Sequence, residues 1–122
     1  MSVFVYDYDH NAPDVEYLEK THKKMFDKIR AAQPELPILI LPAPIYNPDE
    51  GWKERRKIVF NTYAQAIIGG DNNVYYIDGT QLMLPYAKDN GTVDNCHPTD
   101  LGFMSMAENI AEVLKKIMLL GK

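Results

Sequence analysis

Short apolar runs alternate with polar and amphipathic segments along the chain. Three of these runs are rich in β-branched and aromatic residues, namely Val3–Asp7 (VFVYD), Ile38–Leu41 (ILIL) and Val74–Asp78 (VYYID), and this composition predicts β-strands. The first two runs are apolar at almost every position, which is typical of strands covered on both faces in a parallel sheet. The pattern therefore predicts a small sheet that is buried between two layers.

Between the apolar runs, apolar residues recur at the spacing of three and four that predicts helices with one buried face. The first helix is expected to begin after Asp14, an N-cap residue, and to stop before Pro34. The second runs from about Trp52 to Ile68 and ends at a Gly-Gly pair, and the third begins after Thr99. The predicted buried faces are, in chain order, Val15, Leu18, His22, Met25, Phe26, Ile29 and Ala32; then Trp52, Val59, Tyr63, Ala66 and Ile67; then Phe103, Met106, Ala107, Ile110, Leu114 and Ile117.

The order strand, helix, strand, helix, strand, loop, helix calls for right-handed crossovers and a parallel sheet, so the fold class is α/β with layered packing. In such sheets, ligands bind beyond the carboxyl ends of the strands. The polar segments DYDHNAP, PAPIYNPDEGW and DGTQLM follow the three strands, and AKDNGTVDNCHP precedes the last helix. A functional site is therefore expected where these four segments meet.

Composition and charge narrow the function classes. The chain has 122 residues, of which 46% are hydrophobic and 25% are charged, and these values predict a single folded domain over residues 1–122. The net charge of -4 argues against nucleic acid and anionic membrane surfaces as partners. The longest apolar run, PILILPAPI, is far shorter than the roughly 20 residues of a membrane span. The first residues lack the basic and apolar segments of a secretory signal, which leaves the localisation open.

Cofactor and metal motifs are not found in the sequence. Cys96 is the only cysteine, so neither an internal disulfide nor a cysteine cluster is predicted. Neither G-x-G-x-x-G nor a P-loop occurs, so a nucleotide cofactor has no support. A metal site built from Asp7, Asp9, His10, Asp94 and His97 is conceivable, but their spacing is not distinctive. The prediction is a site without cofactor or metal.

The clearest candidate chemistry lies just before the third helix, where Asp94 stands three residues before His97 in VDNCHP. A carboxylate that accepts the Nδ1 proton of an imidazole fixes the tautomer and leaves Nε2 free as a base. The alternative is that Asp94 makes a local Asx turn while His97 only precedes the helix. Because D-x-x-H is a short pattern, the spacing alone leaves both interpretations open.

The context of this pattern extends the interpretation. D-x-x-H-P followed by TDLGFMSMAENI resembles the last sequence block of the SGNH (GDSL-like) ester hydrolases, above all the GDSL-like lipases and acylhydrolases. This resemblance implies a flavodoxin-like, three-layer α/β/α fold, truncated here to about three strands and three main helices. It also implies that His97 is the general base and Asp94 the carboxylate that orients it.

A second block agrees with the first. DYDHNAP resembles the family's third block, G-x-N-D, in which the asparagine donates its side-chain amide to the oxyanion, and this implies that role for Asn11. Asp9 stands where the family usually has glycine, and Ala12 where it has aspartate. The alternative for Asn11 is a turn or helix-capping residue.

The nucleophile of the family has no counterpart in the chain. The only serines are Ser2, before the first strand, and Ser105, which is expected on the surface or in the packing of the last helix. Cys96 would point away from His97 if the segment were extended, which argues against a Cys-His enzyme. The resemblance thus implies the C-terminal part of a serine ester hydrolase of the lipase/acylhydrolase or carbohydrate acetylesterase type. This part is expected to be inactive by itself and to act on a small ester once a serine-bearing segment completes the site. The rival hypothesis is a non-catalytic α/β binding or assembly module.

Several further residues have specific expectations. His10, Tyr46 and Trp52 are possible substrate contacts, and Tyr86 is a possible lining residue near the strand ends. His22 is expected to pack at the edge of the core, and the run KERRK to form a solvated helix face. In the complete family fold the strand Val3–Asp7 is interior, so its open edge here predicts a homo-oligomer.

Overall fold

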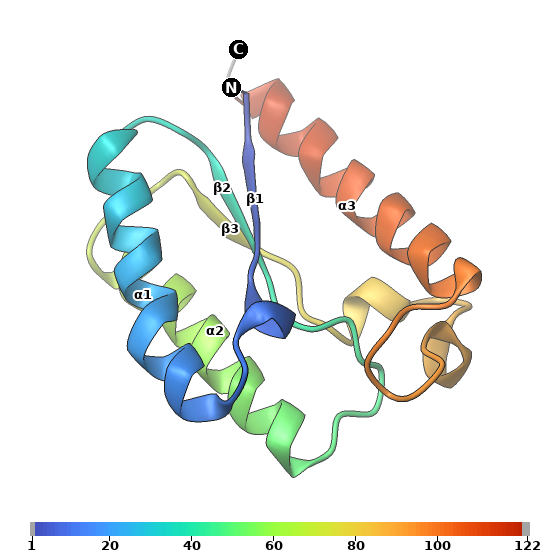
Figure 1. The fold of residues 1–122 in the computed structure, drawn as a ribbon. Helices are drawn as coiled ribbons and strands as arrows, with labels where there is room; N and C mark the ends of the chain where they lie inside the picture. Colours follow the sequence, from blue (N-terminus) through green and yellow to red (C-terminus); the bar gives the residue numbers. More distant parts are fainter. Residues whose placement is uncertain (1, 121–122) are drawn as a thin grey trace.

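The computed structural model describes residues 2–120 and contains one parallel sheet (Figure 1). Its strands are β1 (Phe4–Asp7), β2 (Ile38–Leu41) and β3 (Val74–Tyr76), in the order β1-β2-β3. Phe4 lies opposite Ile38, and Ile38 lies opposite Val74. The three predicted strands are confirmed, and the backbone N–H of Ile77 still donates to the carbonyl oxygen of Ile40 at 3.3 Å beyond the end of β3.

Three long helices cover the two faces of this sheet. Helices α1 (Val15–Ala32) and α2 (Glu50–Ile68) lie on one face, and α3 (Asp100–Leu120) lies on the other (Figure 1). Short 3-10 helices occupy Asp9–Asn11 (η1), Gln81–Met83 (η2) and Lys88–Gly91 (η3). The predicted three-layer α/β/α architecture with three strands and three main helices is therefore confirmed. No helix within residues 2–120 has a stretch long and apolar enough to cross a membrane.

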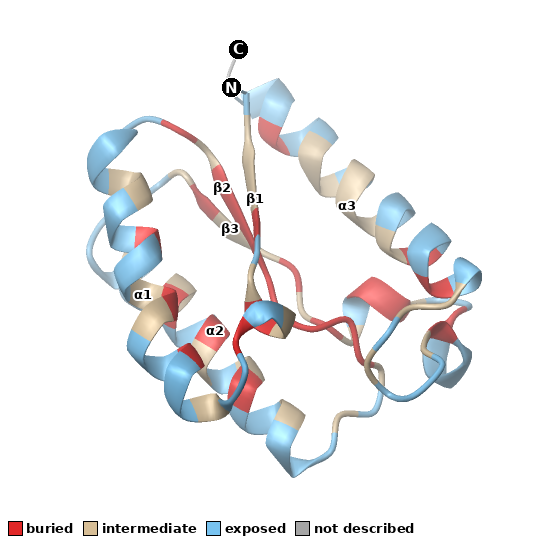
Figure 2. Cartoon of the chain, viewed as in Figure 1, coloured by how far each residue is buried: buried red, intermediate tan, exposed pale blue. Residues whose placement is uncertain are grey.

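The core consists of two clusters separated by the sheet. All four residues of β2 are buried (Figure 2), and because side chains alternate along a strand they point to opposite faces. Ile38 and Ile40 join the cluster below α1 and α2, while Leu39 and Leu41 join the cluster that includes Ile117 of α3. Each fully buried aliphatic side chain contributes roughly 1.5–3 kcal/mol relative to an exposed one. The continuous apolar run of β2 thus reflects burial on both sides, as its sequence predicted.

Helix α2 buries polar residues that the apolar pattern did not predict. Its buried residues are Arg55, Val59 and Thr62, whereas Ile67 is 46% exposed. The prediction that KERRK forms a solvated face is wrong for Arg55, because Arg55 is directed at the buried Asp9 across the layer. Thr62 is buried for a similar reason, since it hydrogen-bonds His22 of α1.

Helix α3 differs from its predicted stripe at two positions. Ile117 is buried and Met106, Ile110 and Leu114 pack against the sheet, but Phe103 is 57% exposed and Ala107 is also exposed. At the start of α3 the buried positions are Gly102 and Ser105. Gly102 lies so close to the carbonyl of Gly91 that any side chain there would collide with it. This close approach of η3 turns Phe103 to the outside.

Helix α1 buries Leu18, His22 and Phe26. Met25 was expected on the same face but is 48% exposed, because it lies to the side of the row formed by these three residues.

The packing role expected for His22 is confirmed. Its Nδ1 lies 2.8 Å from Oγ1 of Thr62, and its ring stacks on Tyr6 with centroids 4.6 Å apart. Nε2 is buried and has no hydrogen-bond partner within residues 2–120. This burial lowers the pKa of His22 from 6.5 to about 4, although the charge of Asp9 opposes the change.

Lowering the pH should therefore destabilise the fold through His22. The folded-state pKa is the lower one, so the unfolded chain takes up the proton first and stability is lost as the pH falls from 6.5 towards 4. We expect a loss of roughly 2 kcal/mol in the free energy of unfolding between pH 7.5 and 4.5 from this residue. Urea denaturation at each pH measures it.

The matched control is His22→Asn, whose amide can still bond Thr62 but does not titrate. Carboxylates contribute equally to both proteins, so the difference between the two pH profiles isolates His22. Parallel profiles would show that the imidazole of His22 is not protonated preferentially in the unfolded chain.

Candidate active site

The polar segments that follow the strands meet at one end of the sheet. η1 follows β1, η2 and η3 follow β3, and the loop between η3 and α3 returns to the same end (Figure 1). This is the carboxyl edge of the three parallel strands, where ligands of open α/β sheets bind. The place predicted for the site is therefore formed by several segments far apart in the sequence.

The loop before α3 is closed on itself by backbone hydrogen bonds. Thr92 and Pro98 form an antiparallel bridge, and the N–H of Val93 donates to the carbonyl of His97 at 2.9 Å. Asn95 has a φ of 58°, in the left-handed region, which lets the chain reverse direction. The loop is a defined turn rather than an extended connection.

This turn joins Asp94 to His97. Oδ1 of Asp94 accepts hydrogen bonds from the backbone N–H groups of Cys96 at 3.1 Å and His97 at 2.7 Å, and Oδ2 lies 2.7 Å from Nδ1 of His97. The Asx turn and the carboxylate–imidazole pair, which the sequence left as alternatives, are both present. Because an ionised carboxylate only accepts, Nδ1 carries the proton and Nε2 presents its lone pair. The His97 side chain is 77% exposed.

The same contacts shift the titration of Asp94. Hydrogen bonds from His97 lower the pKa of Asp94 from 3.8 to about 2. The bond from the backbone N–H of His97 makes the largest contribution to this shift, and the bond from its imidazole adds to it. The carboxylate is thus ionised at every pH at which His97 can act as a base.

Asn11 ends η1, directly beyond β1. Its backbone N–H donates to the carbonyl of Tyr8 at 2.9 Å, while its exposed side chain makes no hydrogen bond within the part of the chain that the structure describes. The N-cap of α1 is Asp14, whose Oδ1 accepts from the N–H of Tyr17 at 2.7 Å. Asn11 therefore does not cap α1, and its amide is available to a ligand.

A buried ion pair holds η1 in place. Oδ1 of Asp9 accepts from Nε of Arg55 at 2.8 Å, and Oδ2 accepts from the backbone N–H of Ala43 at 2.8 Å. Nη2 of Arg55 donates to the carbonyl oxygens of Asp9 and of Ala12, the latter at 2.9 Å. Asp9 is fully buried and Arg55 is 8% exposed. The sequence did not predict this pair, because nothing in the spacing of two residues so far apart indicates that they meet.

A cavity of about 400 Å³ lies beside η1. Its lining includes His10, Trp52, Arg55 and, from the loop before α3, Cys96. The rings of His10 and Trp52 meet edge to face with centroids 5.2 Å apart, and the guanidinium of Arg55 lies 5.1 Å from the indole centre. Two of the three proposed substrate contacts, His10 and Trp52, are therefore brought together next to the residue that precedes His97.

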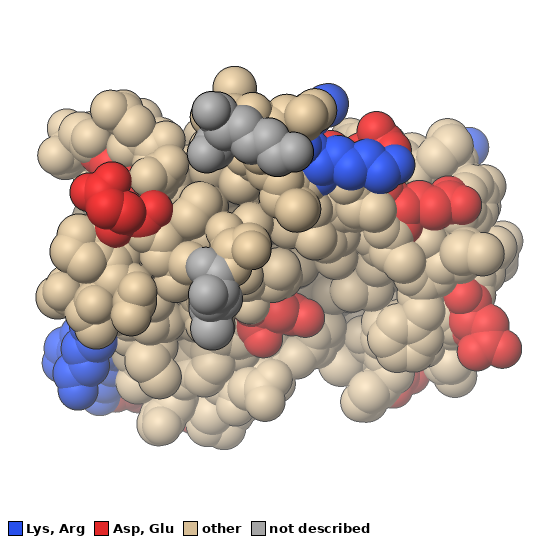
Figure 3. All heavy atoms as spheres, turned by 90° about the horizontal axis from the view of Figure 1, so that it is seen from above, with Lys and Arg blue, Asp and Glu red and all other residues tan. Residues whose placement is uncertain are grey.

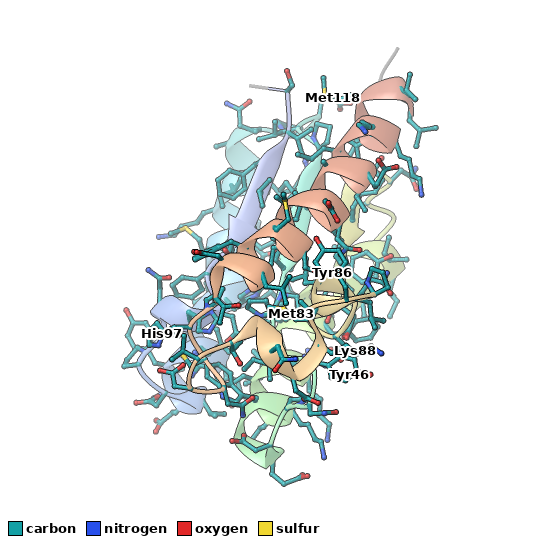
Figure 4. The ribbon with its side chains drawn as sticks, turned by 90° about the vertical axis from the view of Figure 1, so that its right-hand side faces the viewer. Tyr46, Met83, Tyr86, Lys88, His97 and Met118 are labelled. Carbon is teal, nitrogen blue, oxygen red and sulfur yellow. The ribbon has the colours of Figure 1, made fainter. Side chains whose placement is uncertain are left out.

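Tyr46 and Tyr86 lie elsewhere. Figure 4 shows Tyr46 beside Lys88, on the side of this end of the molecule opposite to His97. The hydroxyl of Tyr86 donates to Oε2 of Glu108 at 2.8 Å. Neither residue lines the cavity beside η1.

The serines do not supply a nucleophile at this edge. Ser105 is fully buried and its Oγ donates to the carbonyl of Leu82 at 2.8 Å, so it is a packing residue. Ser2 precedes β1, at the amino edge of the sheet. Within residues 2–120, no exposed serine hydroxyl lies at the carboxyl edge, because the hydroxyl of Ser105 is buried against η2.

Cys96 lies closer to His97 than expected. Because the loop is turned rather than extended, the ligand atoms of Cys96, Asp94 and His97 lie within 4.8 Å of one another. Burial raises the pKa of the Cys96 thiol, and the charge of Asp94 raises it further, so the nucleophilic thiolate is disfavoured. These three residues form the one group within residues 2–120 whose geometry suits a metal ion. The set of Asp7, Asp9, His10, Asp94 and His97 is not assembled, because Asp9 is bound to Arg55.

The fold is that of a known protein family. Residues 1–115 match the model of the GDSL-like Lipase/Acylhydrolase family, and the chain belongs to this family. The family resemblance of the sequence is thereby confirmed. No curated protein matches the chain.

Three solved structures share the fold. A GDSL-like lipase candidate from Bacteroides ovatus ATCC 8483 has a TM-score of 0.74 at 23% identity, over 96% of this chain and 36% of that one. The salicylyl-acyltransferase SsfX3 of a tetracycline biosynthetic pathway has a TM-score of 0.61 at 19% identity, over 87% and 35%. An active-site mutant of a family two carbohydrate esterase from Clostridium thermocellum has a TM-score of 0.64 at 19% identity, over 84% of this chain and 30% of that one. The chain thus spans about a third of the length of these proteins.

The Asp9–Arg55 pair should contribute strongly to stability. Asp9→Asn leaves the arginine buried without its counter-charge, which costs about 3–5 kcal/mol in the free energy of unfolding. Asp27→Asn is the matched control, because the Lys23–Asp27 pair is exposed on α1 and exposed pairs contribute at most about 1 kcal/mol. Urea denaturation of both variants measures the contrast, and equal losses would refute the structural role of the pair.

The titration of Asp94 tests the geometry of the loop. NMR detection of the Asp94 carboxyl carbon should give a midpoint near pH 2 in the parent chain. In His97→Ala the imidazole is lost but the backbone N–H at position 97 remains, so the midpoint should rise only part of the way to 3.8. An unshifted midpoint in the parent chain would mean that the carboxylate does not receive these hydrogen bonds in solution.

Proposed function

We propose that residues 1–122 supply the acid–base and oxyanion part of a GDSL-like serine ester hydrolase site. The observation that carries this proposal is the 2.7 Å contact between Nδ1 of His97 and Oδ2 of Asp94, on the loop that precedes α3 in a chain of this family. Asn11 adds a free amide at the same edge of the sheet. The arrangement supports a base oriented by a carboxylate and a donor for a developing negative charge.

The mechanism follows from these roles. Nε2 of His97 takes the proton from a serine hydroxyl while the serine oxygen attacks the ester carbonyl, and Asp94 stabilises the imidazolium that forms. The amide of Asn11 donates to the oxyanion, an interaction that contributes roughly 3–4 kcal/mol to transition-state stabilisation in comparable sites. The imidazolium then protonates the leaving alcohol, and water, activated by the same base, releases the acid from the acyl-enzyme.

The nucleophile is proposed to come from a segment outside residues 1–122. Within residues 2–120, the strand order leaves one edge of β1 without a partner. Beside that edge, α3 presents apolar side chains that the rest of the chain does not cover, among them Phe103 and Met118. Figure 3, which views the end where β1 begins and α3 ends, shows acidic and basic side chains scattered among residues of other kinds. A further strand that carries the serine would satisfy both the strand edge and this apolar face.

A second copy of the chain would be the rival occupant of the same surface. Pairing along the edge of β1 would produce the homo-oligomer expected from the sequence. It would also cover Phe103 and Met118, since these lie on the helix beside that edge.

One observation favours a second function. Within residues 2–120 no exposed serine lies at the carboxyl edge, because Ser105 is buried, and this arrangement also fits a non-catalytic binding or assembly module. The two functions differ in what happens when a serine-bearing segment is present, because only the hydrolase part then gains activity.

Hydrolysis of p-nitrophenyl acetate tests the proposal. The isolated chain should not exceed the buffer rate, whereas the polypeptide or complex that joins it to a serine-bearing family segment should turn over. In that assembly, His97→Ala should lower kcat about 10⁴-fold and Asn11→Ala about 10²- to 10³-fold. Val93→Ala, on the same exposed loop, should change kcat by less than about twofold.

Two results would contradict the proposal. Turnover by the isolated chain that His97→Ala abolishes would demand a nucleophile within residues 1–122. An active assembly whose kcat is unaffected by His97→Ala would remove His97 from the reaction and favour the binding module.

A further inference from the structure

The loop between η3 and α3 carries three side chains of the kinds that bind transition metals. Asp94, Cys96 and His97 offer a carboxylate oxygen, a thiol sulfur and an imidazole nitrogen, and these ligand atoms lie within 4.8 Å of one another. The ligand atoms around a tetrahedral zinc ion lie roughly 3–4 Å apart, because its bonds are about 2.0–2.3 Å long. Small rotations would therefore bring all three side chains to one ion.

The backbone of this loop brings the three ligands together. Asn95 reverses the chain with a φ of 58°, and the bridge between Thr92 and Pro98 closes the turn. The sequence alone did not indicate this set, because an extended loop would direct Cys96 away from His97. Since the turn is already formed, an ion has to order only the side chains.

The ligand types select the class of metal. Mg²⁺ and Ca²⁺ prefer several oxygen ligands, and this cluster offers a single carboxylate, that of Asp94. A thiolate together with an imidazole suits Zn²⁺ and Co²⁺ instead. A coordinating thiol loses its proton, so the thiolate and the carboxylate together balance the two positive charges of the ion. Three protein ligands leave a fourth position for water.

The cluster is open to solvent. The side chains of His97 and Asp94 are 77% and 51% exposed. Cys96 is half-buried and lines the cavity of about 400 Å³ beside η1. An ion can therefore reach all three ligands, and the two exposed side chains can turn towards it without disturbing the core.

We propose that Asp94, Cys96 and His97 bind a divalent transition-metal ion such as Zn²⁺, with Nδ1 of His97 as the imidazole ligand. Nδ1 lies 2.7 Å from Oδ2 of Asp94, so an ion held by both residues takes the place of the proton between them. The neutral imidazole keeps one proton, which is then carried by Nε2. The thiol proton of Cys96 passes to the solvent, and one proton is released for each ion bound.

Metal binding of this kind regulates the same site. With its proton on Nε2, the imidazole of His97 has no lone pair there to accept the proton of a serine hydroxyl. The metal-bound form is therefore inactive, and a chelator that removes the ion restores the base. This regulatory effect rests on the proposed function, whereas the binding of the metal does not.

Co²⁺ provides a spectroscopic test of the binding. The purified, reduced chain titrated with Co²⁺ should develop a thiolate-to-cobalt charge-transfer band and the strong visible bands of a four-coordinate ion, saturating at one ion per chain. Zn²⁺ should displace the cobalt with a dissociation constant on the order of 1–10 μM, weaker than a site with four protein ligands. Mg²⁺ and Ca²⁺ should leave the bands unchanged.

Variants and NMR locate the ion. Cys96→Ser should remove the charge-transfer band, and Asp94→Asn and His97→Ala should each weaken Zn²⁺ binding at least about tenfold. His10→Ala, which removes an imidazole outside the cluster, is the matched control and should retain the binding. Circular dichroism verifies that each variant is folded. In the zinc complex, ¹⁵N spectra of His97 should show the metal on Nδ1 and the proton on Nε2.

The regulatory effect is measured in the active assembly with a serine-bearing family segment. Zn²⁺ should abolish hydrolysis of p-nitrophenyl acetate at the concentrations that saturate the cluster, and a chelator should restore it. Cys96→Ser should keep the metal-free activity but require at least about tenfold more Zn²⁺ for the same inhibition. An assembly that is inactive without metal would contradict the proposed function and leave the metal site intact.

Four results would overturn the inference. The metal site is refuted if Co²⁺ gives no saturable band, if the charge-transfer band survives in Cys96→Ser, or if Mg²⁺ competes as well as Zn²⁺. The assignment of the ligand atom is refuted if zinc binds Nε2 of His97. An active assembly that keeps its full rate when saturated with zinc would refute the regulation.

Discussion

The buried ion pair between Asp9 and Arg55 is the interaction on which the geometry of the functional edge depends. A carboxylate removed from water costs several kcal/mol unless a cation and further donors satisfy it. Here Arg55 and the backbone N–H of Ala43 fill that requirement. The segment after β1, the segment after β2 and helix α2 are therefore joined at one point. Asn11 and His10 follow Asp9 on η1, so this ion pair also holds them in place.

The other half of the site is organised in a different way. Asp94 and His97 are held by contacts within their own loop, through the Asx turn and the bridge between Thr92 and Pro98. Where this loop enters α3 it is joined to η3, through the close approach of Gly102 to Gly91 and the hydrogen bond from the N–H of Thr99 to the carbonyl of Gly91 at 2.9 Å. The proposed site thus combines a candidate base, His97, that is held by its own loop with a candidate oxyanion donor, Asn11, that is held by a long-range ion pair. The two parts meet because parallel strands deliver their carboxyl ends to one edge.

Part of the sheet and of α3 is not covered by the rest of the described chain. The faces of β2 are fully buried, but the outer edge of β1 and the neighbouring face of α3 are not covered within residues 2–120. The solved proteins of the same fold are about three times as long. The proposed serine-bearing strand against β1 would extend the sheet at this open edge.

The sequence by itself determined the strands, the helices and the pair of Asp94 and His97, because each depends on residues close together in the chain. Apolar runs, N-cap aspartates and a D-x-x-H turn act over a few residues, so their patterns can be recognised directly. The tertiary structure alone decided that Arg55 is buried, that Phe103 is exposed, and that Cys96 turns towards His97. It also decided which candidate contacts share a cavity, bringing His10 to Trp52 and leaving Tyr46 apart. The physical reason is that the burial of a charge or an aromatic ring depends on the partner it meets across the layers, and no local pattern specifies that partner.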